Sequence, residues 1–170
     1  MDEDLITKVL NLNSRFPLFL TRAFLPSLRR TSQKGPVEVV FIGSLSGDLA
    51  VPFVSAYAGS KALTKRVSRI LSAEERILSG SNLSFVYANV GEVQSGTMRA
   101  ATALARPSSD DYATHLVGSF GSGRGVVIPH PVHHLIYALV TGMPEVLCDY
   151  IVLAEGMNVF KKLKESEKRG

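Results

Sequence analysis

The sequence predicts an α/β domain built around a parallel β-sheet. Short apolar runs rich in β-branched residues alternate with longer segments in which apolar residues recur at helical spacing. The short runs are almost continuously apolar, which is typical of strands covered on both faces. The chain has 170 residues, of which 45% are hydrophobic, and this is enough for one sizeable core. We therefore expect one domain over residues 1–170, with a basic tail at residues 159–170.

The first half of the chain predicts a helix, a strand and a second helix. Apolar residues between positions 16 and 28 recur at helical spacing, and Pro26 with the polar run 29–36 is expected to end that helix. Residues 37–42 form a buried strand pattern that stops at Gly43. Residues 55–78 carry the best helical pattern, with charged residues between the apolar ones.

The second half continues the alternation. A strand is expected over 83–89, followed by a loop that contains Gly91 and Gly96. The remaining segments are expected to be helices at 99–105, 110–120 and 133–141, a glycine-rich surface loop at 118–125, a last strand at 150–153 and the basic tail. A doubly wound nucleotide-binding sheet usually needs about six strands, so three strands amount to half a domain. The first strand would then leave one sheet edge that nothing in the sequence can pair.

Composition excludes several classes of protein. The net charge of +4 is modest and much of it lies in the last ten residues, which argues against a nucleic-acid binder with a wide basic face. That basic end could touch anionic lipid headgroups or CoA phosphates, although a solvated helix end accounts for it equally simply. No apolar run approaches the roughly 18 residues of a membrane span, so we expect a soluble or peripheral chain. Cys148 is the only cysteine, which rules out an intrachain disulfide.

Three residues carry a recognisable chemistry. Ser44 follows the first strand, Tyr57 comes thirteen residues later, and Lys61 lies one helical turn after the tyrosine on the same face. Tyrosine has a pKa near 10 in water and is a weak acid–base catalyst at neutral pH unless a cation stabilises its anion, as a lysine ammonium one turn away does. A serine hydroxyl at a strand end can hold the oxygen of a carbonyl substrate against the tyrosine. Ser46 competes with Ser44 for that role.

The surrounding sequence resembles one enzyme family. Residues 42–47 read Ile-Gly-Ser-Leu-Ser-Gly, Pro52 follows, and residues 55–62 read Ser-Ala-Tyr-Ala-Gly-Ser-Lys-Ala. Together they are similar to the active-site stretch of the short-chain dehydrogenase/reductases. The resemblance implies a partial Rossmann-type sheet that lacks the N-terminal glycine-rich half. It assigns Ser44, Tyr57 and Lys61 the three roles above, selects Ser44 over Ser46, and makes Tyr57 and Lys61 cofactor contacts.

Two flanking segments extend the resemblance. Residues 9–13, Val-Leu-Asn-Leu-Asn, are similar to the family helix whose asparagine supports a proton relay, which falls on Asn13 rather than Asn11. Residues 89–98 look like the family loop that touches the nicotinamide, with Val90 in place of a proline and Ser95 in place of a threonine. This implies cofactor contacts at Gly91, Val93 and Ser95.

A looser similarity implies the substrate. Residues 106–113 and 129–135, Met143-Pro-Glu and the basic end follow the order seen in the very-long-chain 3-oxoacyl-CoA reductases, a branch that also includes hydroxysteroid dehydrogenases. It implies NADPH, with NADH not excluded, an acyl-CoA or other carbonyl substrate, fatty-acid elongation and association with the endoplasmic reticulum membrane. A chain complete as given would instead be cytoplasmic. The family's helices also imply a homodimer or association with related subunits.

Two features are not expected to bind ligands. The glycines at 118–125 neither follow a convincing strand nor open a helix, as a dinucleotide loop requires. His130, His133 and His134 lie among prolines without an evident carboxylate or thiolate companion, so we expect no metal site.

Two functions remain open from the sequence. The first is an NADPH-dependent carbonyl reductase. The second is a catalytically impaired, truncated paralogue that acts as a dimerisation or interaction fragment.

Overall fold

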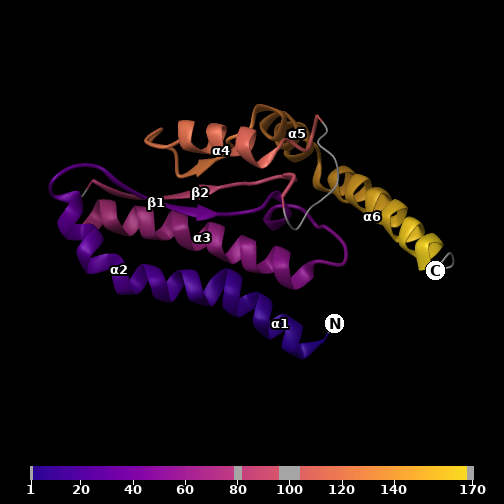
Figure 1. Ribbon diagram of the computed structural model, residues 1–170, viewed down its shortest axis with the longest axis horizontal. Coiled ribbons are helices and arrows are strands. Elements are labelled where there is room, and N and C mark those ends of the chain that lie inside the picture. Colours follow the sequence, from indigo (N-terminus) through magenta and orange to yellow (C-terminus); the bar gives the residue numbers. More distant parts are fainter. Residues whose placement is uncertain (1, 79–81, 96–103, 168–170) are drawn as a thin grey trace.

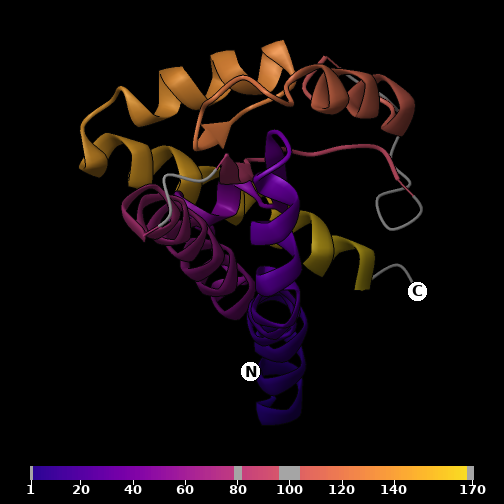
Figure 2. The same cartoon turned by 90° about the vertical axis from the view of Figure 1, so that its left-hand side faces the viewer.

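The computed structural model describes residues 2–78, 82–95 and 104–167 and forms three layers. The central layer is a parallel sheet of order β1-β2-β3, made of Val37–Ile42, Leu83–Ala88 and Val126–Val127. Helices α2 (Phe16–Ser32) and α3 (Ser55–Leu78) cover one face, and α4 (Ser109–Gly118) and α5 (Pro131–Thr141) cover the other (Figures 1 and 2). The predicted α/β class is confirmed.

The N-terminal helices form one long arm. Asp2 caps α1 (Glu3–Leu10), a π-helical turn at Asn11–Arg15 follows, and α2 begins directly after it. Pro26 lies inside α2, which ends at Ser32 within the polar run expected to end it. Loss of one backbone hydrogen bond at a proline is tolerated here because this part of α2 packs on the core through Leu25 and Leu28.

Helix α3 approaches the sheet mainly through small polar side chains, with Leu71 as a partly buried apolar contact to the core. Its buried residues are Ser60, Thr64, Ser68, Ser72 and Glu75. The Ser72 hydroxyl donates to the Phe85 carbonyl at 3.1 Å and accepts from the Phe85 N–H at 2.9 Å. These short side chains let the helix and strand backbones come close, while the apolar Leu63 and Ile70 are each 47% exposed.

The core lies between β1, β2 and the two helices beneath them. Its buried side chains are Phe41, Leu83, Phe85 and Tyr87, and partly buried apolar residues of α2, α3 and β3 pack around them. Glu75 is only 1% exposed, and its carboxylate pairs with Arg29 of α2. The Nε of Arg29 donates to both carboxylate oxygens at 3.1 Å, and its Nη2 donates to Oε1 at 2.6 Å. The ion pair satisfies a carboxylate that burial alone would penalise.

The C-terminal part corrects one prediction. The strand expected at 150–153 is wrong, since these residues lie in α6 (Glu145–Glu167). A run of four apolar residues fits either a strand or a helix, and the flanking residues continue the helix. The third strand is instead Val126–Val127, directly after the glycine-rich loop, where no strand was expected.

The other C-terminal predictions have mixed outcomes. Helices α4 and α5 match the expected helices at 110–120 and 133–141, with α5 starting two residues early. The helix expected at 99–105 falls mostly outside the described residues, and 104–105 form a turn. The expected tail continues as α6 up to Glu167.

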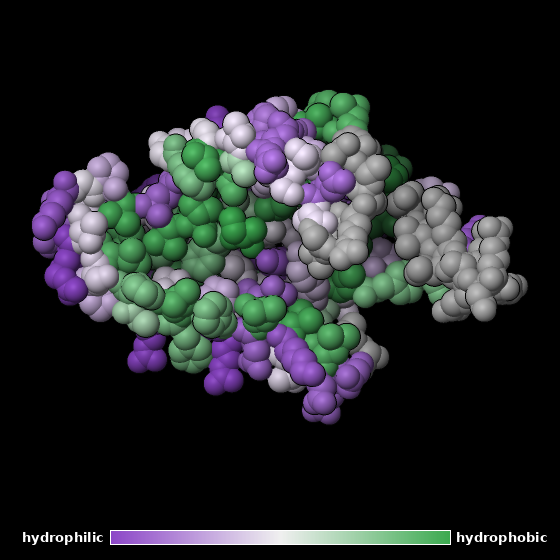
Figure 3. Space-filling model, in the orientation of Figure 1, coloured by the Kyte–Doolittle hydropathy of each residue, from purple (hydrophilic) through white to green (hydrophobic). Residues whose placement is uncertain are grey.

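Strand β1 is an edge strand, as the sequence predicted. Within the described ranges it pairs with β2 alone, in register from Val37 opposite Leu83 to Ile42 opposite Ala88. Figure 3 shows a broad apolar area on the face that carries the edge and the N-terminal helices. Among the described helices, none combines the length and the apolar character needed to span a membrane.

Removal of the Phe85 ring tests the core. The side chain is fully buried and its ring lies 6.3 Å from that of Phe41, so Phe85→Ala is expected to lower the free energy of unfolding by about 3–5 kcal/mol. The matched control is Ile77→Ala on α3, where the side chain is 82% exposed. Urea denaturation should show a large loss for Phe85→Ala alone, and equal losses would contradict this core.

Candidate active site

Ser44 lies at the carboxyl end of β1. It follows Gly43 in extended conformation and caps the short 3₁₀ turn Leu45–Gly47. Its hydroxyl lies 2.9 Å from the Ser46 hydroxyl and accepts from the Ser46 N–H at 3.3 Å. The two serines that competed in the sequence are therefore direct partners.

Tyr57 and Lys61 lie one turn apart near the start of α3. The Lys61 ammonium is 5.5 Å from the centre of the Tyr57 ring and donates to the Ile42 carbonyl at 2.9 Å. Burial lowers the pKa of Lys61, whereas the Tyr57 side chain remains open to solvent at 37% exposure. The lysine thus reaches the end of β1, two residues before Ser44, with the tyrosine ring beside it.

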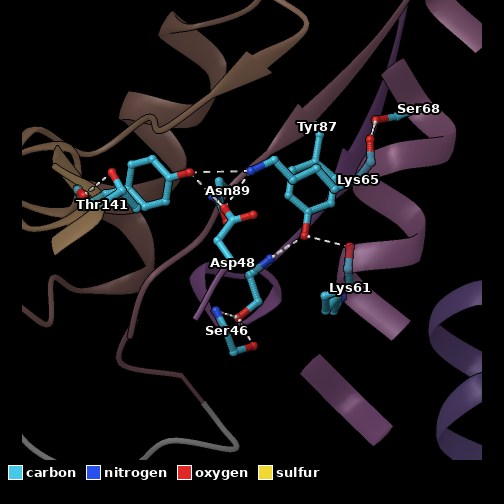
Figure 4. A network of polar contacts seen from close by, with 10 residues as sticks. Ser46, Asp48, Lys61, Lys65, Ser68, Tyr87, Asn89 and Thr141 are labelled. Atoms are coloured by element: carbon cyan, nitrogen blue, oxygen red, sulfur yellow. Dashed lines mark hydrogen bonds and ion pairs between the residues drawn. The ribbon is translucent and has the colours of Figure 1, made fainter. Parts of the chain in front are cut away.

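Tyr87 joins these two parts of the site, although the sequence placed it only in a buried strand. Its hydroxyl accepts from the Ser44 N–H at 3.0 Å and donates to the Lys61 carbonyl at 3.1 Å (Figure 4). Burial raises the pKa of Tyr87 to about 12, so the hydroxyl stays protonated and can donate. A Cβ at Gly43 would lie 2.0 Å from the Tyr87 ring, which explains the glycine between β1 and Ser44.

A second polar network lies behind the serine turn. The Asp48 carboxylate accepts from Lys65 at 2.5 Å, from the Asn89 amide at 2.8 Å and from the Tyr137 hydroxyl at 2.9 Å (Figure 4). Burial, the largest cause, and the neighbouring Asp48 raise the pKa of Tyr137. One carboxylate therefore connects the turn after β1 with α3, β2 and α5. The sequence alone did not identify this network, because the three donors lie 17, 41 and 89 residues from Asp48.

Asn13 lies in the π-helical turn between α1 and α2. Its backbone carbonyl accepts from the Thr64 hydroxyl at 3.1 Å, which fastens the turn to α3. Asn13 and Lys61 line the same cavity of about 280 Å³, which runs along β1 to Ile42. The structure thus brings the expected relay residue and the expected lysine to one space.

The loop after β2 lies beside the serine turn. The Leu45 N–H donates to the Val90 carbonyl at 2.8 Å, so Gly91 follows immediately beyond this contact. A Cβ at Gly91 would come within 2.8 Å of the His133 ring. The His133 Nε2 lies 3.1 Å from the Glu92 carbonyl, and because carbonyls only accept, this nitrogen carries the proton.

The other two loop residues continue away from this contact. Val93 is half-buried and Ser95 is exposed. Their expected cofactor contacts stay predictions, whereas Gly91 has a structural reason of its own in the close approach of His133.

Comparisons with known proteins point to one family. A family model described as short chain dehydrogenase matches residues 1–105. Relatives named "Dehydrogenase/reductase SDR family member 7B" are 38% identical over 71 residues in Mus musculus, covering 42% of this chain and 21% of that protein, and 31% identical over 153 residues in Bos taurus, covering 83% and 46%. The chain spans about half the length of the relatives it matches.

Solved structures share the fold. A short chain dehydrogenase from Burkholderia cenocepacia, crystallised with NADP, superposes with a TM-score of 0.75 at 15% identity, covering 89% of this chain and 62% of that one. A 7beta-hydroxysteroid dehydrogenase gives a TM-score of 0.58 at 13% identity, covering 79% and 50%. At these identities the likeness concerns the fold alone.

The role of the Tyr87 hydroxyl can be tested against a second buried tyrosine. Tyr87→Phe removes the hydroxyl that accepts from the Ser44 N–H and is expected to cost about 1–3 kcal/mol of unfolding free energy. The Tyr112 hydroxyl is buried without a hydrogen-bond partner among the described residues, so Tyr112→Phe should cost nothing or stabilise slightly. Chemical denaturation measures both, and an equal loss in the two variants would contradict the assigned role.

Gly91 can be tested against a glycine that has room for a side chain. Gly91→Ala is expected to destabilise the fold by about 1–3 kcal/mol, because the new methyl group meets the buried His133 ring. Nothing lies within 4 Å of a Cβ at Gly118, the last residue of α4, so Gly118→Ala should be neutral or stabilise by about 0.4–1 kcal/mol. Thermal melts of both variants would refute the packing argument if Gly91→Ala were as stable as the unchanged chain.

Proposed function

The chain belongs to the short-chain dehydrogenase family, and we propose that it is an NADPH-dependent carbonyl oxidoreductase whose reacting groups are Ser44, Tyr57 and Lys61. The observation that carries this proposal is the position of the Lys61 ammonium, 5.5 Å from the Tyr57 ring and bonded to the end of the strand that leads to Ser44. The three side chains come from two elements that the Tyr87 hydroxyl holds together.

The residues divide the chemistry of carbonyl reduction between them. The nicotinamide, when bound, supplies a hydride to the carbonyl carbon. Tyr57 donates the proton to the carbonyl oxygen, and the positive charge of Lys61 stabilises the phenolate that remains. Ser44 donates a hydrogen bond to the same oxygen and holds it near Tyr57, and it can do so while its own oxygen accepts from Ser46.

Proton resupply and cofactor contact are proposed for the space beside β1. Asn13 lines the same cavity as Lys61, which supports its role as a relay residue through water. Lys61 would also contact the nicotinamide ribose, and Gly91, Val93 and Ser95 would line the nicotinamide end. The hydrogen bond between Leu45 and Val90 supports this placement, because it keeps the loop next to the serine turn.

The proposed substrate is a carbonyl compound, with 3-oxoacyl thioesters and steroid ketones as two candidates. The relatives carry the name of a different dehydrogenase/reductase, so the narrower expectations of very-long-chain 3-oxoacyl-CoA reduction, fatty-acid elongation and the endoplasmic reticulum gain no support from them. Those expectations rest on the order of short segments alone.

A second candidate function is association with a related subunit or a second copy. It is favoured by the apolar side chains that α2 leaves exposed, including Phe16 at 59%, Phe19 at 53% and Phe24 at 55%. Beside them Leu10, Leu18 and Leu63 contribute to an almost entirely apolar cavity of about 470 Å³. In this case the site residues would be inherited without supporting turnover.

Binding and turnover of NADPH distinguish the two functions. We expect the purified chain to bind NADPH in an equilibrium titration and to oxidise it in the presence of a suitable ketone or 3-oxoacyl thioester. Tyr57→Phe should lower kcat by about 100-fold or more while the chain still binds NADPH, because only the proton donor is removed. Tyr150→Phe is the matched control, since that tyrosine is 69% exposed on α6.

Each outcome has a clear meaning. A folded chain that shows no binding at millimolar NADPH would reject the oxidoreductase for this chain and leave the association function. Turnover that survives in Tyr57→Phe would reject the assigned proton donor.

A further inference from the structure

Asp111, His115 and His130 form a cluster outside the proposed active site. Asp111 and His115 lie one turn apart on α4, and His130 is the residue that precedes α5. Figures 1 and 2 place both helices on the face of the sheet opposite α2 and α3. In the sequence the histidines at 130–134 have no carboxylate companion nearby, whereas the fold supplies Asp111 from 19 residues away.

Only one of the three neighbouring histidines takes part. His134 is exposed, and His133 directs its Nε2 to the carbonyls of Glu92 and Ala105 at 3.1 and 3.2 Å. His130 is 8% exposed, its Nε2 lies 3.2 Å from the Asp111 Oδ2, and its Nδ1 has no hydrogen-bond partner in the described part of the chain. Within the described residues, Asp111 is therefore the only hydrogen-bond partner of this buried imidazole.

The donor atoms lie close enough together to surround one metal ion. Two ligands bound to Zn²⁺ at about 2.0–2.1 Å lie about 3.3 Å apart. His130 Nε2 lies 3.2 Å from Asp111 Oδ2 and His115 Nδ1 lies 3.6 Å from Asp111 Oδ1, so each histidine faces a different oxygen of the one carboxylate. His115 Nδ1 also lies 2.9 Å from the Asp111 backbone carbonyl, a hydrogen bond that the imidazole gives up when it binds the ion. One donor atom from each of the three residues falls within 4.8 Å of the others. The Asp111 and His115 side chains are 49% and 36% exposed, so they have room to rotate and close the remaining distance.

We propose that Asp111, His115 and His130 form a zinc site that joins α4 to the start of α5. Two imidazoles and one carboxylate are a donor set that Zn²⁺ uses in proteins, and three protein ligands leave one position for water. The carboxylate offsets one of the two charges of the ion, and the exposed sides of Asp111 and His115 give the ion access from solvent. The His115 and His130 rings, with centres 5.0 Å apart, stand at 64° to each other and so can direct nitrogens toward one point.

The expected consequence is a clamp on the C-terminal layer. His130 packs against His133 with ring centres 5.1 Å apart, and His133 holds the Gly91 loop. A metal ion at this cluster would tie α4 to the residues that support this loop without touching Ser44, Tyr57 or Lys61. The site would therefore stabilise the fold, and it does not depend on the proposed oxidoreductase function.

Metal titration of the whole chain tests the proposal. After treatment with a chelator, the chain is titrated with Zn²⁺ by calorimetry, and we expect one equivalent to bind and the Tm to rise. Asp111→Asn and His115→Ala should each weaken binding by at least about 10- to 100-fold, since a ligand contributes no less than the groups that support it. Both side chains are substantially exposed, so these variants should remain folded, which circular dichroism checks.

Two controls separate this cluster from other donors. His134→Ala removes the exposed neighbouring histidine, and Cys148→Ser removes the only thiol; neither should change the affinity. With Co²⁺ in place of Zn²⁺, the visible absorption of a tetrahedral ion should appear in the unchanged chain and disappear in His115→Ala. The proposal is overturned if no zinc binds, if binding is unchanged in Asp111→Asn and His115→Ala, or if a control variant abolishes it.

Discussion

The hydroxyl of Tyr87 is the contact on which the rest of the site depends. It lies on β2, and it bonds the backbone of Ser44 after β1 and that of Lys61 in α3. β1 and β2 pair in parallel with Ile42 opposite Ala88, so the two strands end side by side. This register brings the Tyr87 hydroxyl to the Ser44 N–H just beyond the end of β1. Gly43 completes the arrangement, because any side chain there would occupy the space of the ring. Ser44 and Lys61 therefore owe their relative position to the backbone, not to a contact between their own side chains.

The sequence could predict the elements that repeat a local pattern. The strands at 37–42 and 83–88 and the helix at 55–78 follow from apolar runs and helical spacing, and the structure places them as expected. It could not predict Val126–Val127, because two residues carry no periodicity and become a strand only by pairing with Tyr87 and Ala88. The segment 150–153 shows the converse, since an apolar run without a neighbouring strand continued as helix.

The same distinction between local pattern and tertiary pairing applies to the residues of the candidate site. Ser44, Tyr57 and Lys61 are close in sequence, so spacing and resemblance could identify them. Asp48, Tyr137 and Asn89 are brought together only by tertiary structure, and no local pattern marks a carboxylate that serves three distant donors. The same reasoning applies to Asp111, which lies on a different element from the histidine it contacts. Sequence patterns thus identify groups that act through local geometry and miss those that act across elements.

Helix α3 buries small polar side chains and leaves several of its larger apolar side chains exposed. Its hydroxyls at positions 60, 64, 68 and 72 are buried, and each donates to a backbone carbonyl. Ser72 does so to Phe85 of β2, whereas Ser60 and Thr64 lie against the π-helical turn at Asn11–Arg15. Leu71 packs on the core, whereas Leu63 and Ile70 are exposed, as are Phe16, Phe19 and Phe24 of α2. Within the described residues, β1 also leaves one edge unpaired. Exposing so much contiguous apolar surface to water is unfavourable, so covering this surface is strongly favoured. The packing that places Lys61 at the end of β1 is therefore also the packing that leaves this apolar surface exposed.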